Sequence, residues 1–255
     1  MRRLRPEFAA CASEFVGTFY LALTVILGVL QKAPLAPVAI GFMLAAMTFA
    51  SGPASDAHFN PAVTAGVALS GRGVMDPRRA VFYIVAQCFG GLTASWLAWL
   101  LLGATFTLEP GEGYTFCDAF IVELVFSGAL AFVVLNTSTL TKGSRAGVQA
   151  QFGGLAVGLT LLAAAFAVGP VSGCSLNPAV ACGVMFAHAA RFEGFATHCD
   201  RRLFALYFFV PILGGMLAAG VFRVVREAEF DEEVPIKDDA QKQGQADGLA
   251  IRQGP

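Results

Sequence analysis

Long apolar runs alternate with short polar segments along most of this 255-residue chain. Six runs are long and apolar enough to cross a bilayer as α-helices. Two further segments, 60–69 and 177–187, are too short to cross, yet they are less polar than surface loops. Because irregular backbone is tolerated at membrane depth only where protein or a water-filled cavity surrounds it, we predict that both are re-entrant half-helices in an all-α membrane protein. The six predicted spans are Phe8–Leu30, Pro34–Ser51, Arg79–Leu102, Phe116–Thr137, Gly147–Val168 and Leu203–Val225.

The composition supports a membrane protein and excludes several other classes. Hydrophobic residues make up 56% of the chain and charged residues 14%, whereas soluble domains carry about a quarter charged residues. A net charge of −1 gives no reason to expect a nucleic-acid partner. The six cysteines lack metal-ligand spacing, and no nucleophile–base pair is visible, so we expect no metal, no cofactor and no enzymatic activity.

The two half-helices begin with the same triplet, Asn60-Pro61-Ala62 and Asn177-Pro178-Ala179. Asn is a strong N-cap, because its side-chain oxygen accepts from the free N–H groups of the first turn. Pro suits the first helical position, where no N–H is needed. Each triplet therefore predicts a helix start, and each Asn keeps its NH2 group free to donate elsewhere.

The repeat extends beyond the triplets and divides the chain into two halves. Glu14 lies near the start of the first span and Glu123 near the start of the fourth, and Gly90-Gly91 is matched by Gly214-Gly215. Each half holds three spans, an odd number, so the second repeat (116–226) must be inverted relative to the first (8–102). Inverted repeats place their shared site near the midplane, with half-helix N-termini facing it.

The distribution of Lys and Arg predicts the orientation, because cytoplasmic loops carry the excess. With residues 1–7 as a cytoplasmic N-terminus, ten such residues lie inside and four outside, so we expect both termini in the cytoplasm. Residues 227–255 are polar and are predicted to form a disordered cytoplasmic tail. The inner set is Arg2, Arg3, Arg5, Arg72, Arg78, Arg79, Lys142, Arg145, Arg223 and Arg226; the outer set is Lys32, Arg191, Arg201 and Arg202.

With its paired triplets and inverted halves, the chain resembles the aquaporin, or major intrinsic protein, superfamily over residues 8–226. The resemblance implies that the half-helices enter the membrane from opposite faces and that their Asn caps meet in mid-pore. It implies a homotetramer with one pore per subunit, embedded in a lipid bilayer. The permeants would be water and small neutral solutes, and the half-helix dipoles would exclude protons and cations.

Counting from the triplets, the resemblance assigns the narrow outer filter to Ile40, Ala165, Cys174 and Val180. Most family members carry Arg where this chain has Val180. Valine there resembles one group of plant tonoplast intrinsic proteins, although Ile40 replaces their usual filter histidine. An uncharged filter without a large aromatic predicts passage of glycerol, urea or ammonia besides water.

Three further polar positions carry open alternatives. Glu14 and Glu123 lie within apolar spans, so they are either proton-relay groups or acceptors that brace the loop before each half-helix. Their symmetry-equivalent places favour bracing. His58 either lines the pore or is a structural hydrogen-bonding residue. Asp56 stands where the family usually has Gly, and the sequence indicates no role for it.

The sequence therefore predicts a passive channel for water and small uncharged solutes that excludes ions and protons. The alternatives are a proton-coupled secondary transporter, which also shows inverted repeats and membrane carboxylates, and a channel for water alone. The sequence does not distinguish a plasma membrane from a vacuolar-type membrane.

Overall fold

The computed structural model describes residues 6–140, 146–191 and 200–230, and it confirms the all-helical fold. Eight α-helices and a short 3-10 helix, η1 (Glu227–Glu229), account for most of the described residues. Two helices are short, α3 (Pro61–Ala68) and α7 (Pro178–Arg191), and both begin at the repeated triplets. The six long helices are α1 (Pro6–Leu30), α2 (Ala36–Ser55), α4 (Pro77–Leu102), α5 (Phe116–Thr137), α6 (Ala146–Ser172) and α9 (Arg201–Val225).

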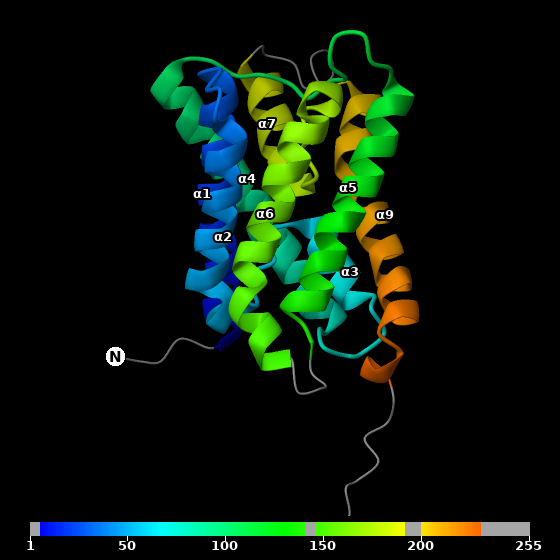
Figure 1. The fold of residues 1–255 in the computed structure, drawn as a ribbon. Coiled ribbons are helices and arrows are strands. Elements are labelled where there is room, and N and C mark those ends of the chain that lie inside the picture. The colour runs from blue at the N-terminus through cyan, green and yellow to red at the C-terminus, as the bar shows by residue number, and fades with distance from the viewer. Residues whose placement is uncertain (1–5, 141–145, 192–199, 231–255) are drawn as a thin grey trace, which may run out of the picture.

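The long helices form a bundle that encloses the two short ones (Figure 1). The described part of the chain begins and ends at the same end of the bundle, the lower end in Figure 1, and the opposite end is called the upper end below. Helix α3 lies in the lower half and α7 in the upper half. Each short helix packs against the third long helix of the other repeat, α3 against α9 and α7 against α4.

Two glycines allow these cross-repeat contacts. A Cβ atom on Gly91 of α4 would overlap the carbonyl oxygen of Ala179, and one on Gly215 of α9 would overlap that of Ala62. Small residues at such crossings let helix backbones approach closely in a membrane, where packing rather than hydrophobic burial drives association. The repeated glycine pairs of the sequence thus seat each short helix at its first turn.

Helices α2 and α6 are longer than the apolar pattern predicted. Each continues past an internal proline, Pro53 in α2 and Pro170 in α6. Each ends at a serine four residues beyond the predicted limits, Ser51 and Val168. Proline removes one backbone hydrogen bond and usually marks a helix end. Here only a few residues follow each proline before the helix ends, so few intrahelical bonds are affected.

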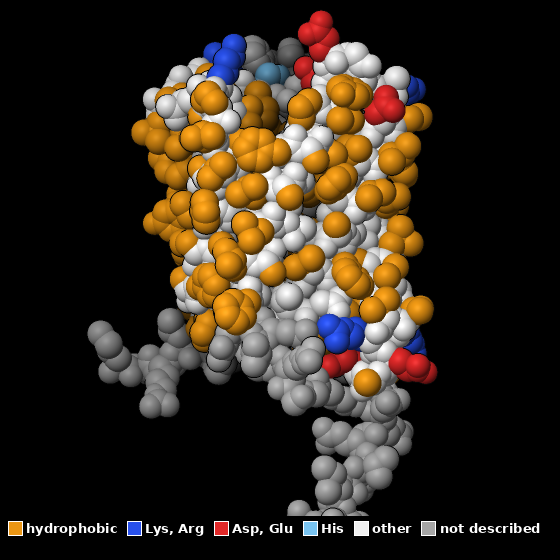
Figure 2. All heavy atoms as spheres, viewed as in Figure 1, with side chains coloured by type: hydrophobic (Ala, Val, Ile, Leu, Met, Phe, Trp, Pro, Cys, Tyr) orange, Lys and Arg blue, Asp and Glu red, His pale blue; other side chains and the backbone are white. Residues whose placement is uncertain are grey.

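The exposed surface supports an integral, multi-pass membrane protein. All six long helices are long and apolar enough to cross a bilayer. Hydrophobic side chains cover the face between the two ends of the bundle, while charged side chains gather at the ends (Figure 2). Phe42, Phe82 and Leu100 are among the large hydrophobic residues that are more than half exposed. A surface of this kind is costly in water and favourable in lipid.

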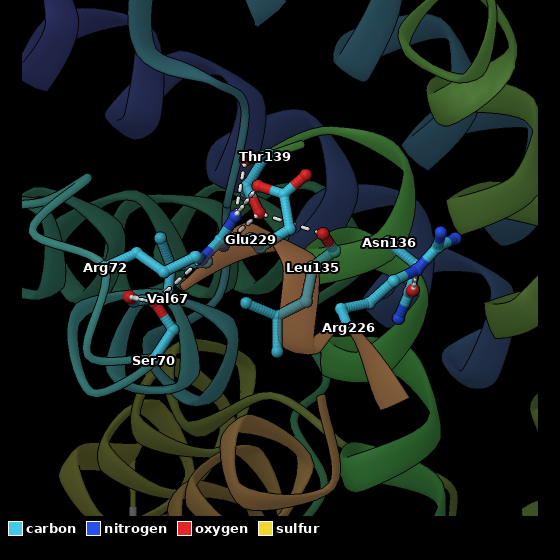
Figure 3. Close-up of polar contacts among 8 residues, drawn as sticks. All are labelled: Val67, Ser70, Arg72, Leu135, Asn136, Thr139, Arg226 and Glu229. Carbon is cyan, nitrogen blue, oxygen red and sulfur yellow. Dashed lines mark hydrogen bonds and ion pairs between the residues drawn. The ribbon is translucent and has the colours of Figure 1, made fainter. Parts of the chain in front are cut away.

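A polar network ties the lower end together (Figure 3). Arg72, in the segment after α3, donates to the carbonyl oxygen of Thr139 at 2.8 Å and to its hydroxyl at 2.6 Å. It also pairs with Glu229 at 3.3 Å and lies over the ring of Phe222, 4.5 Å from its centroid. Burial lowers the pKa of Arg72, and the adjacent Glu229 carboxylate opposes that shift. Residues far apart in the sequence thus close this end of the bundle.

The same network moves the boundary of the predicted tail. The pattern placed a disordered segment from residue 227 onward, but η1 is helical and Glu229 is buried against the bundle. Phe230 packs edge-on against Phe222. The ordered region therefore extends at least to Phe230, and residues 231–255 lie outside the described residues.

We predict that Arg72→Met destabilises the protein by about 3 kcal/mol, because it removes one partner of a buried ion pair and the hydrogen bonds to Thr139. Both side chains are nearly inaccessible, at 2% and 5% exposure. The melting temperature of purified protein in detergent measures the effect. Arg78→Met is the matched control, since Arg78 is exposed on the same end. An equal melting temperature for Arg72→Met and wild type would contradict this role.

Candidate functional site

The two triplets meet at the centre of the bundle. The side-chain oxygen of Asn60 accepts from the backbone N–H of Ala62 at 2.8 Å, and that of Asn177 from Ala179 at 3.0 Å. Each cap was predicted from the sequence. Each amide also crosses to the other repeat: Asn60 Nδ2 donates to the carbonyl of Leu176 at 2.8 Å, and Asn177 Nδ2 to that of Phe59 at 2.9 Å. One N–H of each Asn is therefore used inside the protein, which the sequence did not indicate.

In the first repeat, Glu14 organises the loop before α3. It is fully buried, and its carboxylate accepts from the backbone N–H groups of His58 at 3.0 Å and Phe59 at 2.7 Å. It also accepts from the Ser55 hydroxyl and from Gln87 Nε2, both at 2.7 Å. A buried carboxylate that accepts from this many donors stabilises the loop, whose backbone N–H groups are not bonded within a helix or a β-sheet.

Glu123 makes the equivalent contacts in the second repeat. It is also fully buried, and it accepts from the N–H groups of Ser175 at 2.9 Å and Leu176 at 2.8 Å. The Ser172 hydroxyl completes the set at 2.7 Å. Tyr207 adds a contact to this loop, because its hydroxyl donates to the Ser172 carbonyl at 2.8 Å.

Both loops hold non-glycine residues in left-handed backbone conformations. Phe59 and Leu176 have φ angles of 50° and 47°, and Ala57 and Cys174 have 53° and 50°. Such conformations cost about 1 kcal/mol or more each, so the surrounding contacts must enforce them. Asp56 shares this property at φ 66°, as the residue that ends α2, and this explains why glycine suits the position.

Ser55 and Ser172 are site residues that the sequence reading missed. Each lies five residues before its triplet Asn, within Gly52-Pro53-Ala54-Ser55 and Gly169-Pro170-Val171-Ser172. This Gly-Pro-x-Ser repeat was a visible signal, since it sits at the same distance from both triplets. Each serine links the end of a long helix to the buried carboxylate that supports the following loop.

A cavity of about 340 Å³ runs from the upper end to the centre of the bundle. Apolar side chains from α1, α2 and α6 form one wall, and loop residues 173–176 line the other. The structure brings all four filter candidates to this cavity, together with both triplet asparagines and His58. Those seven residues are Ile40, Ala165, Cys174, Val180, Asn60, Asn177 and His58.

A second cavity, of about 300 Å³, opens toward the lower end. Asp56, Val67 and Met75 line it together with residues 138–140 at the end of α5. His58 lines both cavities and therefore lies at their junction. Neither Glu14 nor Glu123 lines either cavity.

A model of the family described as major intrinsic protein matches residues 5–222 of the chain. The chain belongs to this family. Members of the family are channels rather than enzymes, so the protein is a membrane channel of the aquaporin type. The match covers both repeats and ends three residues before the end of α9.

Individual relatives and a solved structure agree with the family match. Nodulin-26 of Glycine max is 30% identical over 221 residues, which cover 86% of this chain and 73% of that protein. Aquaporin NIP1-2 of Arabidopsis thaliana is 28% identical, with 86% and 69% covered. The X-ray structure of the aquaglyceroporin from Plasmodium falciparum superposes with a TM-score of 0.73 at 19% identity, covering 88% of this chain and 98% of that one. At that identity the superposition supports the fold alone.

Cys174 is the cysteine most exposed to a blocking reagent inside the cavity. It lines the central cavity, while Cys182 is buried on α7 and lines neither cavity. We predict that mercury ions block permeation through Cys174, because a soft thiolate binds a soft metal at a narrow place. Cys174→Ser should remove the block in a liposome flux assay. Full inhibition of that variant would assign the block elsewhere, with Cys182→Ser as the next variant to test.

Proposed function

We propose that the protein is a passive channel for water and small uncharged solutes such as glycerol, urea or ammonia. The observation that carries the proposal is the outer cavity, which is lined mainly by apolar side chains and contains all four filter candidates, none of them charged. Val180 is buried on the first turn of α7 and lines the same cavity as Ile40 and Ala165. A filter without a fixed cation admits neutral solutes that a narrow, charged filter would exclude.

The polar side of the pore supplies the hydrogen bonds that a permeant loses from water. The second N–H of each triplet Asn is available to donate, and carbonyl groups of the loops before α3 and α7 are available to accept. Ions gain little from this lining, because neutral donors and acceptors on one side do not replace a full hydration shell.

Exclusion of protons and cations is attributed to the two short helices. Each presents about half a positive charge at its N-terminus, and the cross-repeat bonds of Asn60 and Asn177 place these ends against one another. The resulting positive potential at the centre repels cations. Water hydrogen-bonded to the two asparagines there is oriented by the protein rather than by its neighbours.

The alternative of a proton-coupled transporter requires a carboxylate that exchanges protons with the pore. Glu14 and Glu123 face the loops instead, and each is saturated with hydrogen-bond donors. We therefore assign them a bracing role. The proposed topology places the lower end, with both described chain ends, in the cytoplasm, and the assembly is a homotetramer by analogy with the family.

An osmotic assay on purified protein in liposomes tests the proposal. Stopped-flow light scattering should show accelerated fluxes of water and of at least one of glycerol, urea and ammonia, without proton leakage. Acceleration of water alone would favour the water-only alternative. Liposomes that match protein-free vesicles for every permeant would contradict the channel for small solutes.

A further inference from the structure

His58 is the residue that lies at the junction of the two cavities. Its side chain is 3% exposed, and its Nε2 atom is buried without a hydrogen-bond partner among the described residues. Its other ring nitrogen, Nδ1, lies 3.2 Å from the hydroxyl oxygen of Thr64. The ring is held edge-on against Tyr83, with centroids 5.7 Å apart. A buried polar atom without a partner, in a residue that lines both cavities, is expected to bind a small molecule that reaches it from the pore.

The hydrogen bonds that link Glu14, Gln87 and Thr64 determine which ring nitrogen of His58 carries the proton. The carboxylate accepts from four donors: the Ser55 hydroxyl, two backbone N–H groups and Gln87 Nε2. We assign the carboxylate as the acceptor in all four bonds, because a hydroxyl and two backbone N–H groups already donate to it. The NH2 group of Gln87, and not its oxygen, then faces it. The second N–H of the same NH2 group reaches the Thr64 hydroxyl oxygen at 2.9 Å.

The Thr64 hydroxyl oxygen therefore accepts a hydrogen bond from Gln87, and its own O–H is left to donate one. Other helical threonines, such as Thr48, donate their hydroxyl to the carbonyl four residues earlier, but no such bond is seen for Thr64. His58 Nδ1 is the acceptor within reach. If Nδ1 carried the proton instead, the Thr64 hydroxyl would be buried with no acceptor, at a net cost. The arrangement that gives the Thr64 hydroxyl an acceptor makes Nδ1 that acceptor and places the proton on Nε2.

The second repeat has no equivalent of this chain of hydrogen bonds. By the spacing from the triplets and glycine pairs, Ser175, Ala181 and Pro211 stand where the first repeat has His58, Thr64 and Gln87. The second repeat therefore has no imidazole at this position and no hydroxyl or amide side chain that could fix its tautomer. The lower side of the pore therefore ends in an oriented N–H donor, whereas the upper side ends in the apolar filter.

We propose that Thr64 and Gln87 are positioning residues that fix His58 as an Nε2–H donor at the cavity junction, where it selects permeants that accept a hydrogen bond. The permeant class is small neutral solutes with a lone pair, such as hydroxyls, urea carbonyls and ammonia; ammonium ions, which have no lone pair, are disfavoured. This inference rests on the proposed channel function. His58 would thus select for permeants that accept a hydrogen bond, which the apolar side chains of the filter cannot do because they have no donor.

The direct test is ¹⁵N NMR of histidine-labelled protein in lipid, in a chain whose other two histidines, His188 and His198, are replaced by Gln. We expect one protonated nitrogen, Nε2, and an unprotonated Nδ1 in the otherwise wild-type protein. Thr64→Val should give a mixture of the two tautomers, and Thr64→Ser should restore the single form. A ring protonated at Nδ1 in the otherwise wild-type protein would overturn the assignment, whether or not the variants fold.

Flux measurements supply the second readout. Thr64→Val should lower urea and glycerol permeability about fivefold, the Boltzmann weight of one hydrogen bond, while Thr64→Ser keeps the wild-type rate. Thr48→Val is the matched control, because its buried hydroxyl bonds only its own helix. Unchanged solute flux and an unchanged tautomer in Thr64→Val would overturn the inference and leave the channel intact. Wild-type liposomes without passive flux would instead reject the proposed function, and the tautomer assignment would still stand on the NMR result.

Discussion

Val180→Arg should reduce glycerol and urea permeability at least tenfold while changing water permeability by less than about threefold. Val180 is 3% exposed and faces the central cavity with Ile40, Ala165 and Cys174. Arginine there would add bulk, a fixed charge and five donors at the narrow place. A tenfold change corresponds to about 1.4 kcal/mol in the height of the permeation barrier.

The control for this experiment separates size from charge. Val180→Leu enlarges the side chain without adding donors or charge, so it should lower solute flux less than arginine does. Both variants are measured by stopped-flow swelling of liposomes at equal protein density. A wild type that conducts only water, together with an unchanged solute profile in Val180→Arg, would show that this residue does not form the filter.

Glu123→Leu should abolish permeation and prevent recovery of folded protein. It would leave the N–H groups of Ser175 and Leu176 and the Ser172 hydroxyl buried without an acceptor. Each such group costs about 1–3 kcal/mol, so together they approach the whole stability of an ordinary fold. The loop would also lose the contacts that hold Leu176 at a φ of 47°.

Glu123→Gln is the milder variant, and it discriminates between a bracing role and a proton-relay role for this carboxylate. It keeps one acceptor oxygen, so we expect a lowered melting temperature with some passive flux retained. Glu112→Leu, on an exposed loop, is the matched control for the deletion and should behave as wild type. If Glu123→Gln kept full stability but lost a proton-driven component of transport, the bracing role would be wrong.

The sequence was sufficient for the architecture because the features that fix it are local and repeated. Apolar length set the six spans, and the paired Asn-Pro-Ala triplets set the starts of α3 and α7. Counting from these triplets also placed Ile40, Ala165, Cys174 and Val180 on one cavity. The starts of α3 and α7 followed from the triplets themselves, whereas the filter positions followed from the resemblance to the family, carried over by their offsets from the triplets.

What the sequence did not reveal depends on partners that are distant in the chain. Arg72 and Glu229 are 157 positions apart, and nothing in either neighbourhood indicates the other. The cross-repeat bonds of Asn60 and Asn177 join positions 116 and 118 apart. His58 stayed undecided between a pore and a structural role because its position depends on Thr64, Gln87 and Glu14 together. Ser55 and Ser172 were recoverable, since their repeat is visible once Pro53 and Pro170 are not taken as helix ends.

The most direct test of a passive channel is solute flux as a function of concentration, measured in proteoliposomes with and without an imposed proton gradient. Glu14 and Glu123 are buried and bonded to the loops, and the four filter candidates are neutral. This geometry predicts a flux of urea or glycerol that rises linearly with concentration and does not respond to the gradient. A flux that saturates and is accelerated or reversed by the proton gradient would contradict the account.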